Sequence, residues 1–264
     1  MADDKKVFLL DAFALIFRAY YALIRSPRNT SKGKNTNAQF GFTNALIELI
    51  TKQKPSHMAV CFDTAAPTER HTDFAEYKAN RQEAPEDLLL AIPDIKRIIK
   101  GFNIPVIEYD GYEADDVIAT IANKGRLHHQ DAINVSTDKG YLPLLPQGVQ
   151  IYDAFARHFL DTEYVKQKFG VAPEQLLSWW ALVGDSTNNI PGVTGVGPKS
   201  AEELMQLGAS LNQALQHPDC PKKLRQKILE QKQDILVYIQ VLALQTNLEL
   251  GLNLQDIRLP EQEA

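Results

Sequence analysis

The sequence predicts an α/β fold, in which a mostly parallel, twisted sheet is flanked by helices and followed by a helical region. Short apolar runs of strand length alternate with segments of helical periodicity as far as residue 152, the pattern of strands joined by helical crossovers. Aspartates follow several of these runs, and helical segments dominate from about residue 176. We therefore predict an α/β domain over residues 1–175 and a helical region over residues 176–264.

Composition sets limits on the class of protein. A chain of 264 residues with 44% hydrophobic and 23% charged residues is typical of a globular protein with a sizeable core. The sequence contains no apolar run near the roughly 18 residues of a membrane span and no signal peptide at its start. We expect a cytoplasmic monomer without membrane association. The net charge of −5 does not favour a nucleic-acid binder, so any such surface must be local.

The sheet domain follows from the order of its elements. The predicted strands cover residues 6–10, 58–62, 104–108, 132–136 and 149–152. The predicted helices cover residues 12–24, which include Arg18, then 40–52, 85–100 and a segment that begins near residue 113. Residues 25–38 carry four basic and no acidic residues among turn formers. They predict a loop that is either simply solvated or in contact with phosphate.

The most informative stretch is Glu113-Ala-Asp-Asp116, just after a turn signal and just before an apolar run. Acidic residues in a first helical turn are favoured by the helix dipole, so plain capping is one interpretation. The other is chemical, because single aspartates also follow three predicted strands: Asp11, Asp63 and Asp138. Carboxylates at the carboxyl ends of parallel strands meet in one crevice. Mg²⁺ and Mn²⁺ prefer such oxygen ligands, so the pattern indicates a divalent metal site.

Residues 64–92 differ from the rest of the sheet domain. They mix charges of both signs and lack apolar periodicity, as expected of a mobile lid. Cations beside an aromatic side chain suit single-stranded nucleic acid, and this stretch offers four such candidates: Arg70, Tyr77, Lys78 and Arg81. A solvated charged face is the alternative.

A glycine turn marks the helical region. Gly195-Val-Gly197 precedes a helix that starts near Pro198 and includes Lys199 and Ser200. Unpaired N–H groups at a helix start suit a phosphate. Together with the flanking Ile-Pro-Gly segment, the turn predicts a helix–hairpin–helix element that holds a DNA backbone without reading bases.

These motifs together resemble the 5′ nuclease superfamily, which includes the 5′→3′ exonuclease domain of bacterial DNA polymerase I and the flap endonucleases. The resemblance covers about residues 6–250 and rests on six segments in family order. These are Leu-Leu-Asp11-Ala, Cys-Phe-Asp63, Tyr77-Lys-Ala-Asn-Arg81, Gly-Tyr-Glu113-Ala-Asp-Asp-Val-Ile, Ser-Thr-Asp138-Lys-Gly, and Gly-Asp185-Ser through Gly-Val-Gly-Pro-Lys199.

The resemblance implies a fold like that of PIN domains and 5′ nucleases, two metal sites and a helical arch over residues 64–92. It assigns Asp11, Asp63, Glu113 and Asp115 to the first metal, and Asp115, Asp138 and Asp185 to the second, with Asp116 as a supporting carboxylate. It implies that Tyr77, Lys78 and Arg81 face the substrate. DNA contacts are expected at Arg18, Arg70, Gly195, Gly197, Lys199 and Ser200, with a K⁺ ion possible at the hairpin.

Two departures from the family pattern concern the second metal. Family members carry an aspartate at the position of Gly140 and another at the position of Asn188. The resemblance therefore implies two Mg²⁺ or Mn²⁺ ions, of which the second is weakened by Gly140.

The expected function is metal-dependent cleavage of DNA at 5′ ends or flaps, in replication or repair. A junction-binding protein that keeps the fold with a weakened metal centre is the alternative from a different class. A PIN-type ribonuclease would share the acidic strand ends, but the predicted arch and the glycine hairpin disfavour it.

Overall fold

A six-stranded sheet forms the centre of the computed structural model, which describes residues 6–127 and 131–260. The strand order is β3-β2-β1-β4-β5-β6, and neighbours are parallel except for the antiparallel β5–β6 pair. The bounds are β1 Lys6–Asp11, β2 His57–Cys61, β3 Val106–Ile107, β4 Asp131–Val135, β5 Gln150–Asp153 and β6 His158–Leu160. The predicted mostly parallel sheet is confirmed. The sequence analysis missed β6, because three residues with two exposed side chains give no readable period.

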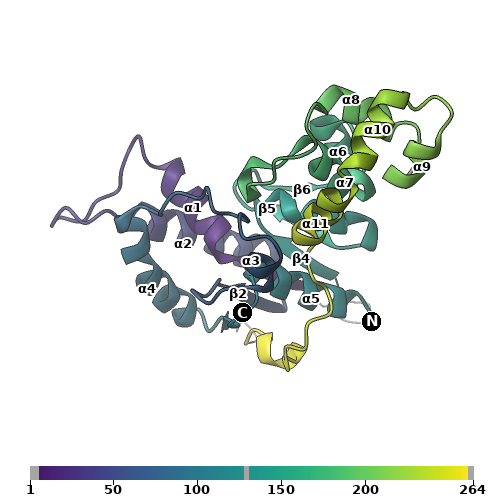
Figure 1. Cartoon of the computed structure of the whole chain (residues 1–264). Helices are drawn as coiled ribbons and strands as arrows, with labels where there is room; N and C mark the ends of the chain where they lie inside the picture. The colour runs from purple at the N-terminus through teal and green to yellow at the C-terminus, as the bar shows by residue number, and fades with distance from the viewer. Residues whose placement is uncertain (1–5, 128–130, 261–264) are drawn as a thin grey trace.

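Helices cover both faces of the sheet (Figure 1). Side chains alternate along each strand, so Phe8 and Leu10 of β1 pack under α1, α2 and α4, whereas Val7 and Leu9 pack under α5. The helices are α1 Ala12–Ala22, α2 Asn37–Gln53, α3 Glu69–Asp73, α4 Glu86–Gly101, α5 Ala114–Leu127, α6 Thr162–Phe169, α7 Leu176–Val183, α8 Pro198–Met205, α9 Leu211–Gln216, α10 Lys222–Glu230 and α11 Lys232–Leu242. Short 3₁₀ helices lie at η1 Lys139–Gln147, η2 Pro173–Gln175, η3 Ser186–Asn188 and η4 Leu254–Ile257.

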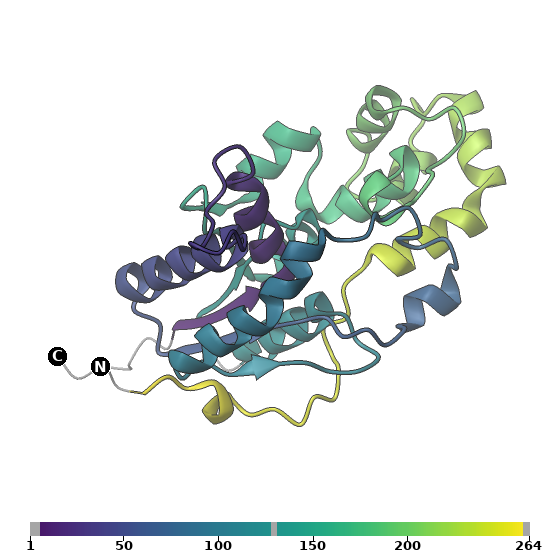
Figure 2. The same cartoon turned by 90° about the vertical axis from the view of Figure 1, so that its left-hand side faces the viewer.

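The helices α8, α9 and α10 gather at one end of the molecule, away from α1, α2 and α4, and α11 leads from there back toward α3 (Figures 1 and 2). Their core is nevertheless continuous with that of the sheet, because Ile118 of α5 and Ile235 of α11 belong to one cluster of buried side chains.

Residues 243–259 return from α11 along α5 to the edge of the sheet, and we call this segment the strap (Figure 1). Thr120 Oγ1 donates to Gln245 O at 3.3 Å, Asn123 Nδ2 to Thr246 O at 3.1 Å, and Lys124 Nζ to Leu248 O at 3.2 Å. Three side chains on one face of α5 thus bind the backbone of the strap.

Two segments predicted to be irregular have defined shapes. Residues 25–36 form a protruding turn closed by a bridge between Asn29 and Asn35 (Figure 1). Residues 64–85, within the expected arch, contain only one short helix, α3. Three hydrogen bonds tie residues 76–80 to η3 and to Asn189, which follows it. Lys78 N donates to Asn188 O at 3.1 Å, Asn80 Nδ2 to Ser186 O at 2.8 Å and Asn189 Nδ2 to Glu76 O at 2.7 Å.

Across residues 6–127 and 131–260, every helix is too short or too polar to cross a lipid bilayer.

Candidate functional site

Four carboxylates line one cleft of about 500 Å³ at the carboxyl ends of the central strands. Asp11 ends β1, Asp63 follows β2, and Asp138 follows β4, so three neighbouring strands deliver them. Asp115 comes from the first turn of α5. The α5 start is fixed against β2, because Ala114 N donates to Asp63 Oδ1 at 2.7 Å. The parallel sheet therefore brings Asp11, Asp63, Asp115 and Asp138 together, as expected from the sequence.

The cleft holds its negative charge at an energetic cost. Asp11 is 5% exposed. Burial, with the charges of Asp138 and Asp63, raises its pKa to about 7, although Ser136 Oγ donates to it at 2.8 Å. Burial and the charges of Asp11 and Asp138 also raise the pKa of Asp115 well above its ordinary value. Tyr141 donates to Asp115 Oδ1 at 2.7 Å. Such a group of carboxylates is more stable with a cation among them.

The donor set suits a hard divalent cation, because all four groups are carboxylate oxygens. Asp11, Asp63, Asp115 and Asp138 are the residues that would hold it. As the side chains lie, within the described part of the chain, no three acidic, thiol or imidazole groups converge closely enough to form a finished site. Each of the four accepts at least one hydrogen bond from the protein instead.

Glu113 turns away from this cleft, although the resemblance assigned it to the first metal. Its carboxylate accepts from Lys78 Nζ at 2.8 Å, from Tyr77 Oη at 3.2 Å and from Arg70 Nη1 at 3.2 Å. Burial favours the neutral form of Glu113, but the charges of Lys78 and Arg70 outweigh it and hold its pKa below the ordinary value. Glu113 is thus paired with three side chains of the segment predicted as the arch.

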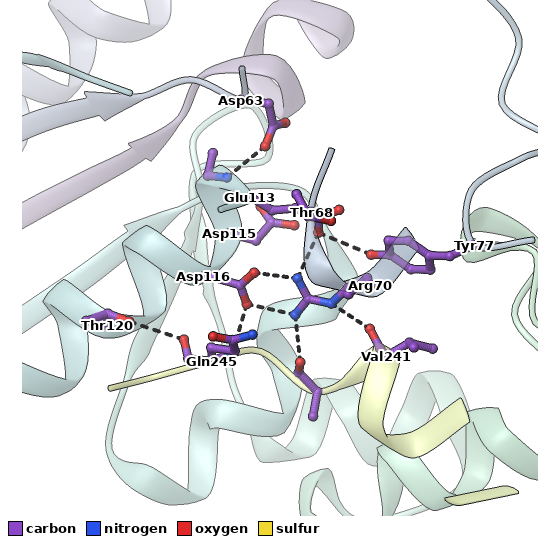
Figure 3. Close-up of polar contacts among 12 residues, drawn as sticks. Asp63, Thr68, Arg70, Tyr77, Glu113, Asp115, Asp116, Thr120, Val241 and Gln245 are labelled. Carbon is purple, nitrogen blue, oxygen red and sulfur yellow. Dashed lines mark hydrogen bonds and ion pairs between the residues drawn. The ribbon is translucent and has the colours of Figure 1, made fainter. Parts of the chain in front are cut away.

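Arg70 lies in the interior rather than on a DNA-facing surface (Figure 3). It is 5% exposed, and its guanidinium pairs with Asp116. It also donates to Val241 O at 2.8 Å and to Ala243 O at 2.7 Å, at the junction of α11 and the strap. These bonds, with the one to Glu113, use all five N–H groups of an arginine.

These contacts correct two sequence expectations. Arg70 has no N–H group left for a phosphate, so we propose a structural role for it in place of DNA contact. Asp116, the expected supporting carboxylate of the metal site, also accepts from Gln245 N at 2.8 Å and is committed to the same network. The charge run around Arg70 gave no sign of this, because its partners lie on distant segments.

The remaining arch candidates divide into two kinds. Tyr77 is 4% exposed, so it supports Glu113 from within and does not face a substrate. Lys78 and Arg81 line the cleft. Lys78 has a positive φ of 57°, a conformation uncommon outside glycine, and its ammonium lies over the Tyr77 ring at 4.8 Å. Its side chain reaches both Glu113 and the cleft.

Asp185, expected at the second metal, has both carboxylate oxygens occupied. Lys139 Nζ lies 2.6 Å from Oδ1, and Asn188 Nδ2 donates to Oδ2 at 2.7 Å. Asp185 is buried and is not among the residues that line the cleft. Gly140 adjoins Asp138, whose Oδ1 accepts from Gly140 N at 2.7 Å. Asp185, which the resemblance assigned to a second metal ion, is thus paired with the Lys139 ammonium and the Asn188 side-chain amide.

The glycine hairpin has the shape that the sequence predicts. Gly195 has a φ of +77°, and Gly197 precedes the first residue of α8. Ser200 Oγ accepts from Gly197 N at 3.3 Å and helps to cap this helix. Lys199 is exposed, as is Arg18 on α1.

Three side chains that donate to the predicted metal aspartates were not themselves predicted from the sequence: Ser136, Lys139 and Tyr141. Ser136 and Lys139 lie within two residues of Asp138, so their closeness to a candidate ligand was the available signal. Tyr141 is fully buried and is indistinguishable in sequence from a core aromatic.

Two family models together match the chain from residue 6 to residue 264. The model of the 5′-3′ exonuclease N-terminal resolvase-like domain matches residues 6–170, and that of the 5′-3′ exonuclease C-terminal SAM fold matches residues 171–264. The chain belongs to the 5′-3′ exonuclease family. This family is part of the resemblance found in the sequence, which is confirmed.

Curated relatives of the chain include 5′-3′ exonucleases, flap endonucleases and DNA polymerases I. The chain is 36% identical over 255 residues to a 5′-3′ exonuclease of Aquifex aeolicus, with 97% of this chain and 87% of that protein covered. It is 36% identical to flap endonuclease Xni of Colwellia psychrerythraea, with 95% and 91% covered. It is 35% identical to DNA polymerase I of Treponema pallidum, with 97% of this chain covered. The chain spans only 26% of that polymerase.

Solved structures share the fold. The T5 5′-exonuclease with bound divalent zinc ions superposes with a TM-score of 0.73 at 20% identity, covering 90% of this chain and 89% of that chain. Flap endonuclease-1 from Methanococcus jannaschii gives a TM-score of 0.57 at 17% identity, with 94% and 80% covered. At this level of identity the likeness establishes the fold alone.

Proposed function

We propose that the protein is a divalent-metal-dependent 5′ nuclease that hydrolyses phosphodiester bonds at 5′ ends or flaps of DNA. The observation that carries this proposal is the cleft in which Asp11, Asp63, Asp115 and Asp138 face Lys78 and Arg81. Membership of the 5′-3′ exonuclease family supports it. The relatives named 5′-3′ exonuclease and flap endonuclease Xni, most of whose length the chain covers, support it as well.

The chain's own residues perform three tasks in this proposal. The four carboxylates hold Mg²⁺ or Mn²⁺, which when bound supplies a Lewis acid and an activated water. Lys78 and Arg81 place positive charge beside the cleft, where it stabilises the charge that builds up on a phosphate during cleavage. The contacts between residues 76–80 and η3 close the cleft on one side, so a single strand fits there better than a duplex.

Contacts to the rest of the substrate come from the helical region. The N–H groups at the start of α8, together with Lys199, suit a phosphate of the duplex backbone. Lys227 Nζ lies close to Gly195 and adds a further cation at this hairpin. We propose no base-specific contact there, because the groups offered are backbone amides and flexible ammonium groups.

A second candidate function deserves a test because of Asp185. Its pairing with Lys139 and Asn188 removes a carboxylate from the metal cleft. A junction-binding protein with a weakened metal centre would show that feature. Whether the cleft still supports turnover decides between the two.

Cleavage of a labelled 5′-flap DNA, measured against Mg²⁺ and Mn²⁺ concentration, tests the proposal. We expect metal-dependent release of a short 5′ product, with binding retained in Ca²⁺. Mn²⁺ should support cleavage at lower concentration, because it is less strict than Mg²⁺ about octahedral geometry. Tight binding in Ca²⁺ without cleavage in either active metal would instead establish the binding protein.

Gly140→Asp should strengthen metal binding at the Asp138 end of the cleft. A side chain at residue 140 would have its Cβ 3.1 Å from Asp138 Oδ1, so the new carboxylate would join this cluster after a small shift. We expect the metal concentration for half-maximal cleavage to fall about three- to tenfold, roughly 0.7–1.4 kcal/mol. The metal-free protein should melt at a lower temperature because of the added repulsion.

Gly140→Asn is the matched control, since it has the same shape without the charge. Equal metal dependence in the Asp and Asn variants would mean that residue 140 does not face the bound cation.

A further inference from the structure

A second cavity, of about 490 Å³, opens from the metal cleft. The two cavities share Ala14, Phe17, Asp138 and Thr187 in their linings, so they form one continuous surface. We call the second cavity the cationic pocket. Its remaining lining residues are Arg18, Tyr21, Thr137, Lys139 and Lys168.

The cations of this pocket differ in their availability. Lys139 is neutralised by Asp185. Arg18 and Lys168, in contrast, have no carboxylate partner within residues 6–127 and 131–260 and are exposed. Two unneutralised cations in the lining of one pocket favour an anionic ligand.

Aromatic side chains hold Lys168 in place without cancelling its charge. Its Nζ donates to the Tyr164 hydroxyl at 2.7 Å and lies 5.1 Å from the Tyr164 ring centroid and 5.5 Å from that of Phe169. Across the pocket, Tyr21 is 48% exposed and contacts Phe17, with 6.3 Å between ring centroids. The pocket therefore combines positioned charge with an apolar wall, which suits the phosphate and sugar of a nucleic-acid backbone.

The position of the pocket indicates which part of a DNA substrate it meets. Residues 76–82 contribute to the lining of the metal cleft but not to that of the pocket, whereas Thr187 of η3 lines both. The pocket lies toward α6 instead. Gly170, which follows α6, lies against the Glu202 side chain of α8, the helix that begins at the glycine hairpin.

We propose that the cationic pocket binds a phosphodiester of the duplex part of the substrate, between the metal cleft and the glycine hairpin, through Lys168 and Arg18. This assignment rests on the proposed function, since it takes DNA as the ligand. A flap that leaves beneath residues 76–80 would pass side chains that line the cleft but not the pocket. Lys168 therefore serves duplex binding and not binding of the unpaired strand.

Fluorescence anisotropy in Ca²⁺, with a labelled duplex and a labelled single strand of equal length, tests the pocket. Lys168→Gln should weaken duplex binding about fivefold at 0.15 M salt and lower the salt slope by about 0.9, the contribution of one phosphate contact. Binding of the single strand should be unchanged. Tyr21→Ala should weaken duplex binding while the salt slope stays the same.

Two matched variants sharpen this experiment. Lys166→Gln removes the same charge from an exposed position of α6 outside the pocket lining, and it should behave as the parent. Lys168→Arg keeps the charge and should retain most of the duplex affinity. Unchanged duplex binding in Lys168→Gln, or an equal loss on the single strand, would overturn the assignment.

The outcome is separable from that of the proposed function, because flap cleavage is measured on the same variants. If the parent protein binds duplex through Lys168 but cleaves no flap, the pocket assignment holds and the proposed nuclease activity is wrong. If the parent protein cleaves flaps and Lys168→Gln binds duplex equally well, the nuclease proposal holds and the pocket assignment is wrong. A parent that binds no duplex contradicts both.

Discussion

Asp115→Asn should lower flap cleavage by at least about a hundredfold while leaving flap binding in Ca²⁺ within a few fold. Asp115 faces the cleft from α5 beside Asp11 and Asp138. A bound metal contributes several kcal/mol to such a reaction, and each 1.36 kcal/mol is a factor of ten in rate. The amide keeps the shape of the side chain and still accepts from Tyr141, so the local fold should persist.

The same variant should gain stability without metal. Burial and two neighbouring carboxylates raise the pKa of Asp115, so its charge opposes folding. We expect Asp115→Asn to melt at a higher temperature than the parent in EDTA, and to gain less from Mg²⁺. Asp110→Asn, an exposed change just before α5, serves as the control. Near-parental cleavage by Asp115→Asn would show that Asp115 is not a metal ligand.

Arg70→Met should destabilise the folded protein by roughly 3–5 kcal/mol, the cost of leaving one partner of a buried ion pair unpaired. Asp116 has a side chain only 2% exposed and would keep Gln245 N as its remaining neighbour in this network. The carbonyls of Val241 and Ala243 would also lose their donor. Urea denaturation of the parent and the variant measures the difference.

Two further variants test the cause of this loss. Adding Asp116→Asn to Arg70→Met removes the stranded charge but keeps an acceptor for Gln245 N, so the double variant should be more stable than Arg70→Met alone. Arg97→Met breaks an exposed pair with Asp94 and should change little. If Arg70→Met has parental stability but weaker DNA binding, Arg70 contacts DNA, as was expected from the sequence.

The Arg70 variant should also change the response to acid. In the parent, Lys78 and Arg70 hold the pKa of Glu113 below the ordinary value of about 4.3. This pairing contributes stability above that value, and the contribution is lost as the pH falls through the lower folded pKa. Without Arg70 the pKa of Glu113 should rise, so part of the stability difference should disappear below about pH 4.

The sequence predicted most of the sheet and the carboxylates of the cleft for a physical reason. Apolar runs show where strands end, and parallel strands end at one edge, so Asp11, Asp63 and Asp138 could be placed together before any contact was known. Asp115 followed from the helix start beside them. The apolar pattern along the sequence is therefore enough to place these four carboxylates.

The partners of Arg70 and Glu113 could not be read in the same way. Val241 and Ala243 are more than 150 residues from Arg70, and no local pattern marks a carbonyl as the acceptor of a distant guanidinium. A run of mixed charges is typical of a solvated segment, so a buried arginine within it went unnoticed. The direction of Glu113 depends on Lys78 and Tyr77, whose positions the sequence left open.

The strap has a consequence for how its sequence can vary. Thr120, Asn123 and Lys124 are spaced along one helix face and donate to the main-chain oxygens of Gln245, Thr246 and Leu248, and every amino acid carries such an oxygen. Exposed positions such as Asn247 and Glu249 can therefore drift freely. The number of residues in the strap cannot vary in this way, because a single insertion would shift each carbonyl away from its donor. The bonds to α5 therefore constrain the length of this segment more than the identity of its exposed side chains.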